Sequence, residues 1–325
     1  MIIRLIIIIT ALVDLALIKP TEAQQRKLTR IGYVTADSGS SPPEVFLQGL
    51  RALGHIEGKN IAFEYRTSEG RPGRNSDLVA DLVRLKVDLI VAEGTSPSLA
   101  AKKATATIPI VMVSTTDPVG TGIVASLSHP GGNVTGLTTI TGELGGKLLD
   151  ILKEVVPGVT RVVIPGPPPG SRSADFFMKE TELPARALKI HLIRTTVSSR
   201  EDYEKVFRVA AKERAQALLV RIPPFAPVEQ RKQFVELAAK KRLPAIYQAS
   251  NWVDIGGLLS YGAERNLQFQ RAAVYVDKIL KGAKPADLPI EQPMKFEFVI
   301  NLKAAKQIGL TIPPNVLVRA DRVIR

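Results

Sequence analysis

Short β-branched runs alternate with amphipathic segments along this chain, and the alternating series occurs twice. Such alternation predicts an α/β protein with parallel sheets, because each helix returns the chain to the edge at which the next strand begins. Two consecutive series of similar size indicate two Rossmann-like lobes rather than one long sheet. Such lobes bind ligands at the carboxyl ends of their parallel strands, so a cleft between two facing edges is the expected site.

The first series ends just after a Pro-Gly-Gly-Asn turn at 130–133. Gly54 ends its first helix, and Asn75 or Ser76 is expected to cap its second. Its strands are expected at 31–35, 61–65, 87–92, 108–113 and 134–137, and its helices at 44–53, 77–85 and 98–104.

The second series is followed by a less regular stretch. We expect Pro184 to interrupt the helix that contains it, and Pro313-Pro314 to block further helix near the end of the chain. Asn301 is a candidate cap for a short helix that runs through Ile308 and ends at Gly309. The expected strands are 161–164, 190–194, 217–220, 245–247, 258–261 and 296–300, and the expected helices are 147–155, 175–188, 202–212, 228–240 and 267–281.

Residues 1–23 are typical of an export signal. Arg4 precedes a strongly apolar run over 5–17, and Thr21-Glu22-Ala23 offers small residues at the two positions that matter for cleavage. An uncleaved membrane anchor is the alternative, but the uninterrupted run over 5–13 is far shorter than the ~20 apolar residues of a spanning helix. We therefore expect a periplasmic or other extracytoplasmic protein, cleaved after Ala23.

The chain carries a formal net charge of +13 and contains no Cys. Disulfides, thiol nucleophiles, Cys-ligated zinc and a lipid-modified Cys anchor are therefore excluded. A basic chain invites a nucleic-acid interpretation, but the basic residues are scattered and aromatic residues, which form stacking platforms, are only 5% of the chain. We expect a basic solvated surface and no nucleic-acid partner.

The motifs of common enzymes are absent from the sequence. The three His lack metal-ligand spacing, and no Gly-x-Ser-x-Gly elbow is present. The nearest match to a phosphate loop, at 142–148, is one residue short, and Leu148 lacks the hydroxyl that binds magnesium. We expect no enzyme activity, no cofactor and no metal.

Polar side chains follow two strands of the first series. Thr95 and Ser96 lie at the start of a helix, where backbone N–H groups and hydroxyls suit a ligand carboxylate. Ser114, Thr116 and Asp117 follow the next strand, and Asp117 suits a ligand ammonium group. The same residues could simply cap helices or turns, but their position at one sheet edge favours a ligand site.

Nine short motifs of this sequence, in the same order, resemble those of a known family. They are GLRALG (49–54), IPIV (108–111), DPVG (117–120), PGGNVTG (130–136), LPAIY (243–247), GGLLSYG (256–262), YVDKILKG (275–282), NLKAA (301–305) and LTIPP (310–314). Over 31–324 the chain resembles the uncharacterised or tryptophan-type ABC transporter substrate-binding proteins, which have a periplasmic-binding-protein type 1 fold.

The resemblance implies two lobes joined by three crossings. Lobe one would comprise 24–142 plus about 263–290, and lobe two 143–262 plus about 291–325. It also implies a membrane permease and an ATPase as partners, and relatives include binders of aromatic amino acids. We expect a monomer.

The chain departs from the family after the first strand of lobe two. Relatives commonly have a sequence like Trp-Asn-Pro there, whereas this chain has Pro-Gly-Pro-Pro-Pro-Gly at 165–170, followed by Ser171. From lobe two we expect Ser171, Gln248 and Trp252 to contact the ligand. Trp252, the only Trp, is either a stacking wall for the ligand or a core residue.

These features predict the solute-binding component of an ABC import system. It would capture a small molecule, with an aromatic amino acid or a related carboxylate as the candidate, by closure of the two lobes. A binding protein that reports ligand occupancy to a membrane receptor is the alternative. An enzyme that uses the cleft would need a general base, which the sequence does not offer.

Overall fold

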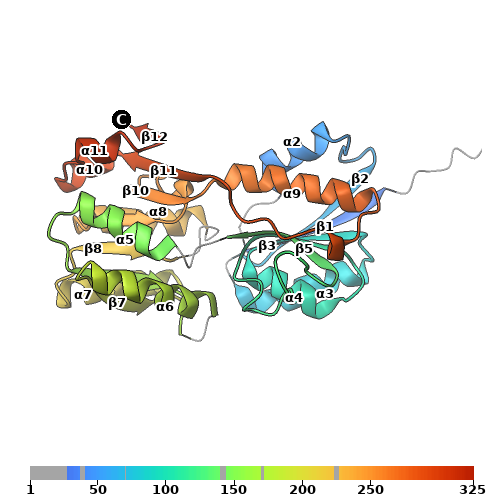
Figure 1. Ribbon diagram of the computed structural model, residues 1–325, viewed down its shortest axis with the longest axis horizontal. Helices are drawn as coiled ribbons and strands as arrows, with labels where there is room; N and C mark the ends of the chain where they lie inside the picture. The colour runs from blue at the N-terminus through green and yellow to red at the C-terminus, as the bar shows by residue number, and fades with distance from the viewer. Residues whose placement is uncertain (1–27, 37–40, 70, 140–143, 170–171, 223–226) are drawn as a thin grey trace, which may run out of the picture.

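The computed structural model describes residues 28–36, 41–69, 71–139, 144–169, 172–222 and 227–325. The expected export signal at 1–23 lies outside these residues. In Figure 1 the chain forms two α/β lobes beside each other, and chain segments run between them. Each lobe is built around one sheet.

Lobe one contains a parallel five-stranded sheet in the order β2-β1-β3-β4-β5. All side chains of the central strand β3 are buried, because helices cover both faces of the sheet. The strands are β1 (Thr29–Thr35), β2 (Ile61–Thr67), β3 (Leu89–Glu93), β4 (Ile110–Thr116) and β5 (Val134–Thr139).

Alternate strand residues of lobe one point to opposite faces and form two separate cores. Tyr33 and Val91 pack on one face with α2 and α9, whereas Val34 and Ile90 pack on the other with α3 and α4. Although α9 follows the strands of lobe two in sequence, it therefore belongs to lobe one. The helices are α2 (Glu44–Ala52), α3 (Asn75–Arg84), α4 (Thr95–Ala104) and α9 (Arg265–Leu280).

Lobe two contains a seven-stranded sheet in the order β12-β11-β10-β9-β8-β6-β7. All its neighbouring strands are parallel except β10 and β11, which are antiparallel. The strands are β6 (Arg161–Gly166), β7 (His191–Thr196), β8 (Ala217–Val220), β9 (Ala245–Tyr247), β10 (Leu259–Ala263), β11 (Phe296–Asn301) and β12 (Arg322–Ile324).

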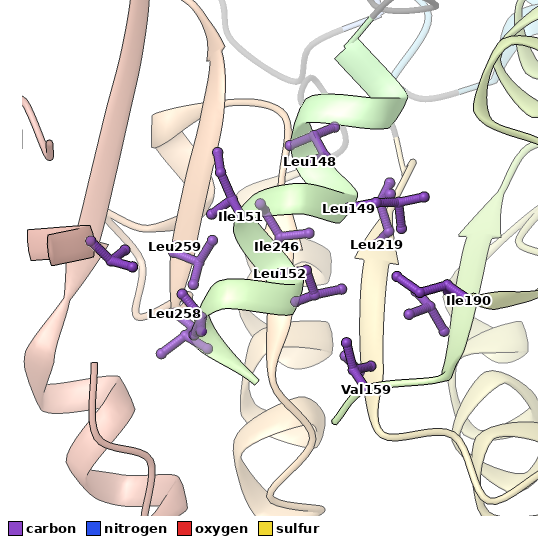
Figure 2. Close-up of a cluster of buried hydrophobic side chains, with 14 of the residues drawn as sticks. Leu148, Leu149, Ile151, Leu152, Val159, Ile190, Leu219, Ile246, Leu258 and Leu259 are labelled. Carbon is purple, nitrogen blue, oxygen red and sulfur yellow. The ribbon is translucent and has the colours of Figure 1, made fainter. Parts of the chain in front are cut away.

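Helices also cover both faces of the second sheet. Figure 2 shows how α5 directs Leu148, Leu149 and Leu152 towards Leu219 and Ile246 of the central strands. The opposite face packs against α7 and α8. The helices are α5 (Leu144–Val155), α6 (Arg172–Ala187), α7 (Tyr203–Lys212), α8 (Val228–Lys240), α10 (Leu302–Ile308) and α11 (Pro314–Leu317).

The chain passes between the lobes three times: after β5, after β10, and between η5 (Pro285–Asp287) and β11. The first two passages leave at the carboxyl ends of β5 and β10, and β11 starts at that same edge because it is antiparallel to β10. The second and third passages touch, since the Glu264 N–H donates to the Lys295 carbonyl at 3.1 Å. Both carboxyl edges therefore face the junction of the lobes, and the predicted fold class is confirmed.

Three local predictions were wrong. Pro184 does not interrupt α6, because it lies in the last turn, where its ring packs against Gly146. Neither Asn75 nor Ser76 caps α3: the helix begins at Asn75, and that side chain donates to Ser96 at 2.9 Å instead. Pro314 does not block further helix but begins α11, since the first turn of a helix accepts Pro.

The predicted short helix near the end of the chain is confirmed. The Asn301 side chain accepts from the Ala304 N–H at 3.0 Å and caps α10. Gly309 ends the helix with a left-handed φ of 75°, which Gly adopts without a steric penalty.

Candidate functional site

Hydroxyl groups gather at the carboxyl edge of lobe one, around the start of α4. Gly94 is the N-cap with a φ of 94°, and no side chain of the described residues caps the helix. The Thr95 hydroxyl accepts from the Thr116 N–H at 3.0 Å, and the Thr116 and Thr139 hydroxyls lie 3.1 Å apart. The Ser96 hydroxyl accepts a hydrogen bond from the Asn75 side chain of α3. The structure thus brings together Thr95, Ser96 and Thr116, all half-buried, next to an uncapped helix start.

Ser114 and Asp117 are two non-glycine residues of this edge with left-handed backbone conformations, at φ of 54° and 45°. The Ser114 hydroxyl donates to the Gln268 side-chain oxygen at 2.5 Å. One carboxylate oxygen of Asp117 accepts from the Gly120 N–H at 2.9 Å. Asp117 therefore stabilises its own turn, and a second role towards an ammonium group stays a prediction.

A buried carboxylate lies behind these hydroxyls. Glu93, at the end of β3, is 2% exposed and accepts from the Tyr33 and Thr35 hydroxyls at 2.9 and 3.0 Å. It also forms an ion pair with Arg265, the first residue of α9. This pair ties the helix that follows the second passage to the strand edge of lobe one.

The carboxyl edge of lobe two presents an oriented amide. The Gln248 side-chain oxygen, just after β9, accepts from Arg221 at 2.5 Å, and the Arg221 guanidinium lies 4.2 Å from the Phe177 ring centre. Burial lowers the pKa of Arg221 to about 10, because a low dielectric disfavours the charged form. Arg221, Phe177 and Gly166 line a small pocket at the ends of β6 and β8.

Trp252 lies in the core of lobe two, at 1% exposure. Its ring stacks on Tyr247 with centroids 5.0 Å apart and meets Phe234 edge-on at 6.2 Å. This placement corresponds to the core interpretation of Trp252, which is too buried to form a wall of a ligand site. Ser171, the remaining predicted contact from this lobe, lies outside the described residues.

Sequence reasoning missed four residues of the two edges: Thr139, Arg221, Arg265 and Gln268. Thr139 ends β5 and Arg221 follows β8 directly, so the rule that sites lie at strand ends would have found both. Arg265 and Gln268 come from α9, a helix that returns from the other lobe. Nothing local in the sequence indicates which strand ends such a helix will meet.

The part of the chain that the structure describes offers no cluster of three or more His, Asp or Glu that could hold a metal ion. In the same part, no helix is long and apolar enough to cross a bilayer.

Two sheets whose carboxyl edges face a common junction, each carrying polar groups, are typical of the periplasmic-binding-protein fold. The chain matches the model of the ABC transporter substrate binding protein family over residues 31–324. It belongs to that family and is the substrate-binding component of an ABC transport system.

Individual relatives are similar to this chain in sequence or fold. The "Tyrosine-binding protein" of Clostridioides difficile is 23% identical over 304 residues, covering 90% of this chain and 84% of that protein. A conserved domain protein from Vibrio cholerae superposes with a TM-score of 0.83 at 29% identity, covering 91% of this chain and 100% of that one. An ABC domain from Streptococcus pneumoniae in complex with L-Trp gives a TM-score of 0.81 at 24% identity, with the same coverage.

Proposed function

We propose that the protein captures an aromatic amino acid, or a closely related small carboxylate, between its two lobes. The observation that carries the proposal is the start of α4, which no described side chain caps, beside half-buried hydroxyls at the carboxyl edge of lobe one. Relatives described as a tyrosine-binding protein and as a complex with L-Trp support this class of ligand.

In the proposed site the ligand carboxylate lies at the start of α4. The backbone N–H groups of Thr95 and Ser96 have no helical carbonyl partner, and the helix dipole favours an anion there. Thr116 and Asp117 lie beside it, and Asp117 offers a carboxylate to the ligand ammonium group. From lobe two, Gln248 offers its amide. Each group satisfies a different part of an amino-acid backbone.

Closure of the lobes is the proposed mechanism. A ligand bound to one edge alone makes half of its contacts, and only the closed form lets both edges contact it, so binding favours closure. A micromolar dissociation constant corresponds to about −8 kcal/mol. A carboxylate held at a helix start contributes about 0.3–2 kcal/mol of this energy, so contacts from both lobes are needed to reach it.

The proposed setting is the extracytoplasmic side of a membrane, reached through the export signal at 1–23. There the protein, as a monomer, delivers its ligand to a permease that an ATPase drives. The ligand leaves unchanged, because the proposed site holds it through hydrogen bonds and carries out no chemical step.

The test is calorimetric titration of the mature protein with L-tyrosine and L-tryptophan, and then with other amino acids, aromatic acids, nucleosides and sugars. We expect saturable binding of an aromatic amino acid, and a loss of at least 100-fold with its carboxamide derivative, which lacks the anion. Equal affinity for the acid and the amide would contradict the placement of the carboxylate at α4.

A matched pair of variants tests the same point from the protein side. Thr95→Val should weaken binding about tenfold, because it removes a hydroxyl at the start of α4. Thr107→Val removes an exposed hydroxyl just beyond the other end of that helix and should leave the affinity unchanged. Saturable binding of a sugar or nucleoside, with silence towards every amino acid, would refute the proposed ligand class.

A further inference from the structure

Gln268 projects from the second turn of α9 to the carboxyl edge of lobe one. One turn earlier, Arg265 pairs with Glu93 at the end of β3, and Gln268 itself bonds to Ser114 near the end of β4. These two contacts place the start of α9 over the strand ends that carry the proposed site. Gln268 is 5% exposed, so its side chain is a built part of this edge rather than a surface group.

Of the two polar groups of the Gln268 amide, only the oxygen has a hydrogen-bond partner among the described residues. Its oxygen accepts from the Ser114 hydroxyl at 2.5 Å, which fixes the orientation of the amide plane. Its Nε2 group is buried and has no hydrogen-bond partner among the described residues. A buried donor without an acceptor is unfavourable, and native proteins retain such groups rarely, most often where they have a function.

The backbone around Ser114 is shaped to orient this amide. Ser114 has a φ of 54°, a conformation that a serine adopts at an energetic cost. The pairing of β4 with β5 also shifts its register between Met112 and Thr115. Irregularities of this kind redirect side chains next to binding sites. Here the irregular stretch includes Ser114, whose hydroxyl reaches α9.

The same arrangement occurs at the edge of lobe two. The Gln248 oxygen accepts from Arg221 at 2.5 Å, while its Nε2 group is buried with no partner in the described part of the chain. Each lobe thus contributes one amide whose oxygen is held by the protein and whose N–H donors have no acceptor there. Two such amides at facing edges suit a ligand that brings acceptor oxygens.

We infer that Gln268 is a ligand-contacting residue of lobe one, that its amide N–H donates to a ligand oxygen in the closed form, and that Ser114 is its positioning residue. The inference rests on the proposed function and adds to it a contact from α9, opposite Gln248. It also assigns Ser114 an indirect role, since its hydroxyl proton is directed to Gln268.

The test uses the mature protein with L-tyrosine and L-tryptophan as probes, by calorimetry, together with thermal melting of the free protein. Gln268→Leu removes the buried donor, and Gln268→Glu keeps the bond from Ser114 but turns the donor into an acceptor. Both should weaken binding at least tenfold, which corresponds to about 1.4 kcal/mol. Gln270→Leu, at an exposed position of the same helix, should bind like the wild type.

Melting temperature separates a ligand contact from a structural role. Gln268→Leu removes a buried donor that lacks an acceptor, which offsets the loss of the bond from the half-buried Ser114 hydroxyl, so it should melt within about 2 °C of the wild type. Ser114→Gly accommodates the positive φ and removes the hydroxyl, so it should bind three- to tenfold more weakly without a loss of stability. A Gln268→Leu affinity within twofold of the wild type overturns the inference, as does a large fall in melting temperature with unchanged affinity.

The wild-type titration is evaluated first and on its own. If the wild type binds neither amino acid, both the proposed function and the inference about Gln268 are refuted. If the wild type binds and only the variant ratios disagree, the proposed function stands and the role of Gln268 is refuted.

Discussion

The buried carboxylate of Glu93 anchors the first turn of α9, so neutralising it should destabilise lobe one. Glu93 is 2% exposed and receives hydrogen bonds from Tyr33 and Thr35 as well as the ion pair from Arg265. Burial raises the pKa of Tyr33 well above its usual value, and the adjacent Glu93 charge adds to the effect. Tyr33 therefore remains a donor to Glu93 at every pH at which the protein would work.

The expected magnitude follows from what Glu93→Gln keeps and loses. The variant keeps the shape and one acceptor oxygen but loses the charge, and hydrogen bonds to a charged group contribute about 1.5–3 kcal/mol against about 1 kcal/mol for neutral pairs. Removing one partner of a buried pair costs about 3–5 kcal/mol, but the Arg265 side chain is 30% exposed and remains partly solvated. We expect a loss of about 2–3 kcal/mol, or about 4–10 °C in melting temperature.

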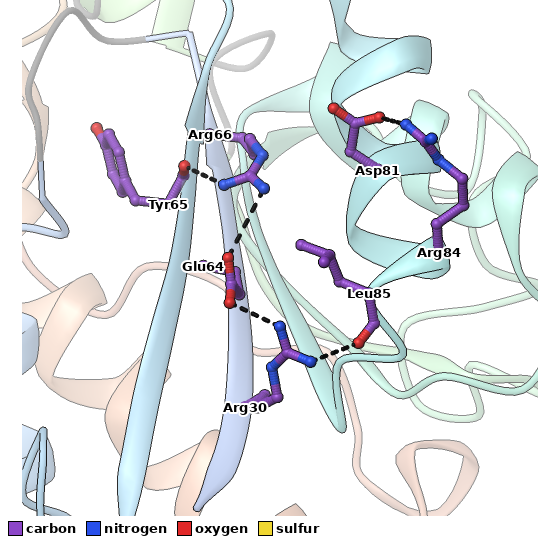
Figure 3. Close-up of polar contacts among 7 residues, drawn as sticks. All are labelled: Arg30, Glu64, Tyr65, Arg66, Asp81, Arg84 and Leu85. Atoms are coloured by element: carbon purple, nitrogen blue, oxygen red, sulfur yellow. Dashed lines mark hydrogen bonds and ion pairs between the residues drawn. The ribbon is translucent and has the colours of Figure 1, made fainter.

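The assay is differential scanning calorimetry of the mature protein at pH 7, with Glu64→Gln as the control. Figure 3 shows Glu64 of β2, an edge strand of the same sheet, paired with Arg30 and Arg66; the ion-pair distances are 2.8 Å and 3.7 Å. These side chains are 27–35% exposed, so the control should lose less than about 1 kcal/mol. A Glu93→Gln protein that melts within 1 °C of the wild type would refute the anchoring role.

Three further changes test the packing and electrostatics of the fold. Burial alone would raise the pKa of Asp277, but hydrogen bonds from Lys281 and His55 outweigh it and hold that pKa below its usual value. The stability that these bonds contribute is present above the unfolded pKa of about 3.9 and is lost as pH falls through the folded pKa. The wild type should therefore be more stable than Asp277→Asn by about 1–2 kcal/mol at pH 7, and this difference should shrink below about pH 4 in urea titrations. Gly262→Ala places a Cβ 1.9 Å from the backbone oxygen of Gln248, just after strand β9, so it should lose about 3 kcal/mol or more in the same titrations. Trp252→Phe should lose about 2 kcal/mol through the cavity it leaves, with unchanged affinity for L-tyrosine by calorimetry.

For each of these three variants, a control or a specific outcome tests the prediction. A constant gap between wild type and Asp277→Asn from pH 7 to pH 2 would mean that the carboxylate adds no pH-dependent stability. Gly73→Ala, where a Cβ would meet no atom within 4 Å, is the control for Gly262→Ala and should be neutral within about 0.5 kcal/mol. Weaker ligand binding by a stably folded Trp252→Phe protein would restore the stacking-wall interpretation of that residue.

Hydrophobic periodicity predicted the elements well where burial alone defines them. Strands β8 and β9 and helix α8 have the predicted bounds. The errors lie where polar residues continue a buried element. Strand β4 runs on to Thr116, past the predicted end at 113, because Thr115 is fully buried despite its hydroxyl. Helix α4 starts at Thr95 rather than 98, since Pro97 is compatible with a first turn.

The residues of the candidate site likewise fall into those that local sequence pattern locates and those that depend on tertiary packing. Thr95, Ser96, Ser114 and Thr116 could be chosen from sequence because each lies at a strand end or helix start, and local pattern locates those points. Trp252 could not be decided, because its burial depends on Phe234 and Tyr247 meeting it in three dimensions. The contribution of α9 was equally hidden, because it depends on how one lobe receives a helix from the other.

That helix also determines where the lobes can move. Since α9 packs against α2, β4 and β5 of lobe one, and its first residue is fixed to Glu93, it moves with lobe one as a unit. In the proposed closure, lobe two would therefore turn at the passages on either side of α9, where Glu264 and Lys295 pair at 2.8 Å. The proposed ligand contact of Gln268 lies one helical turn from Glu264 in the second of these passages. Ligand binding and closure would then share a single structural element, the start of α9.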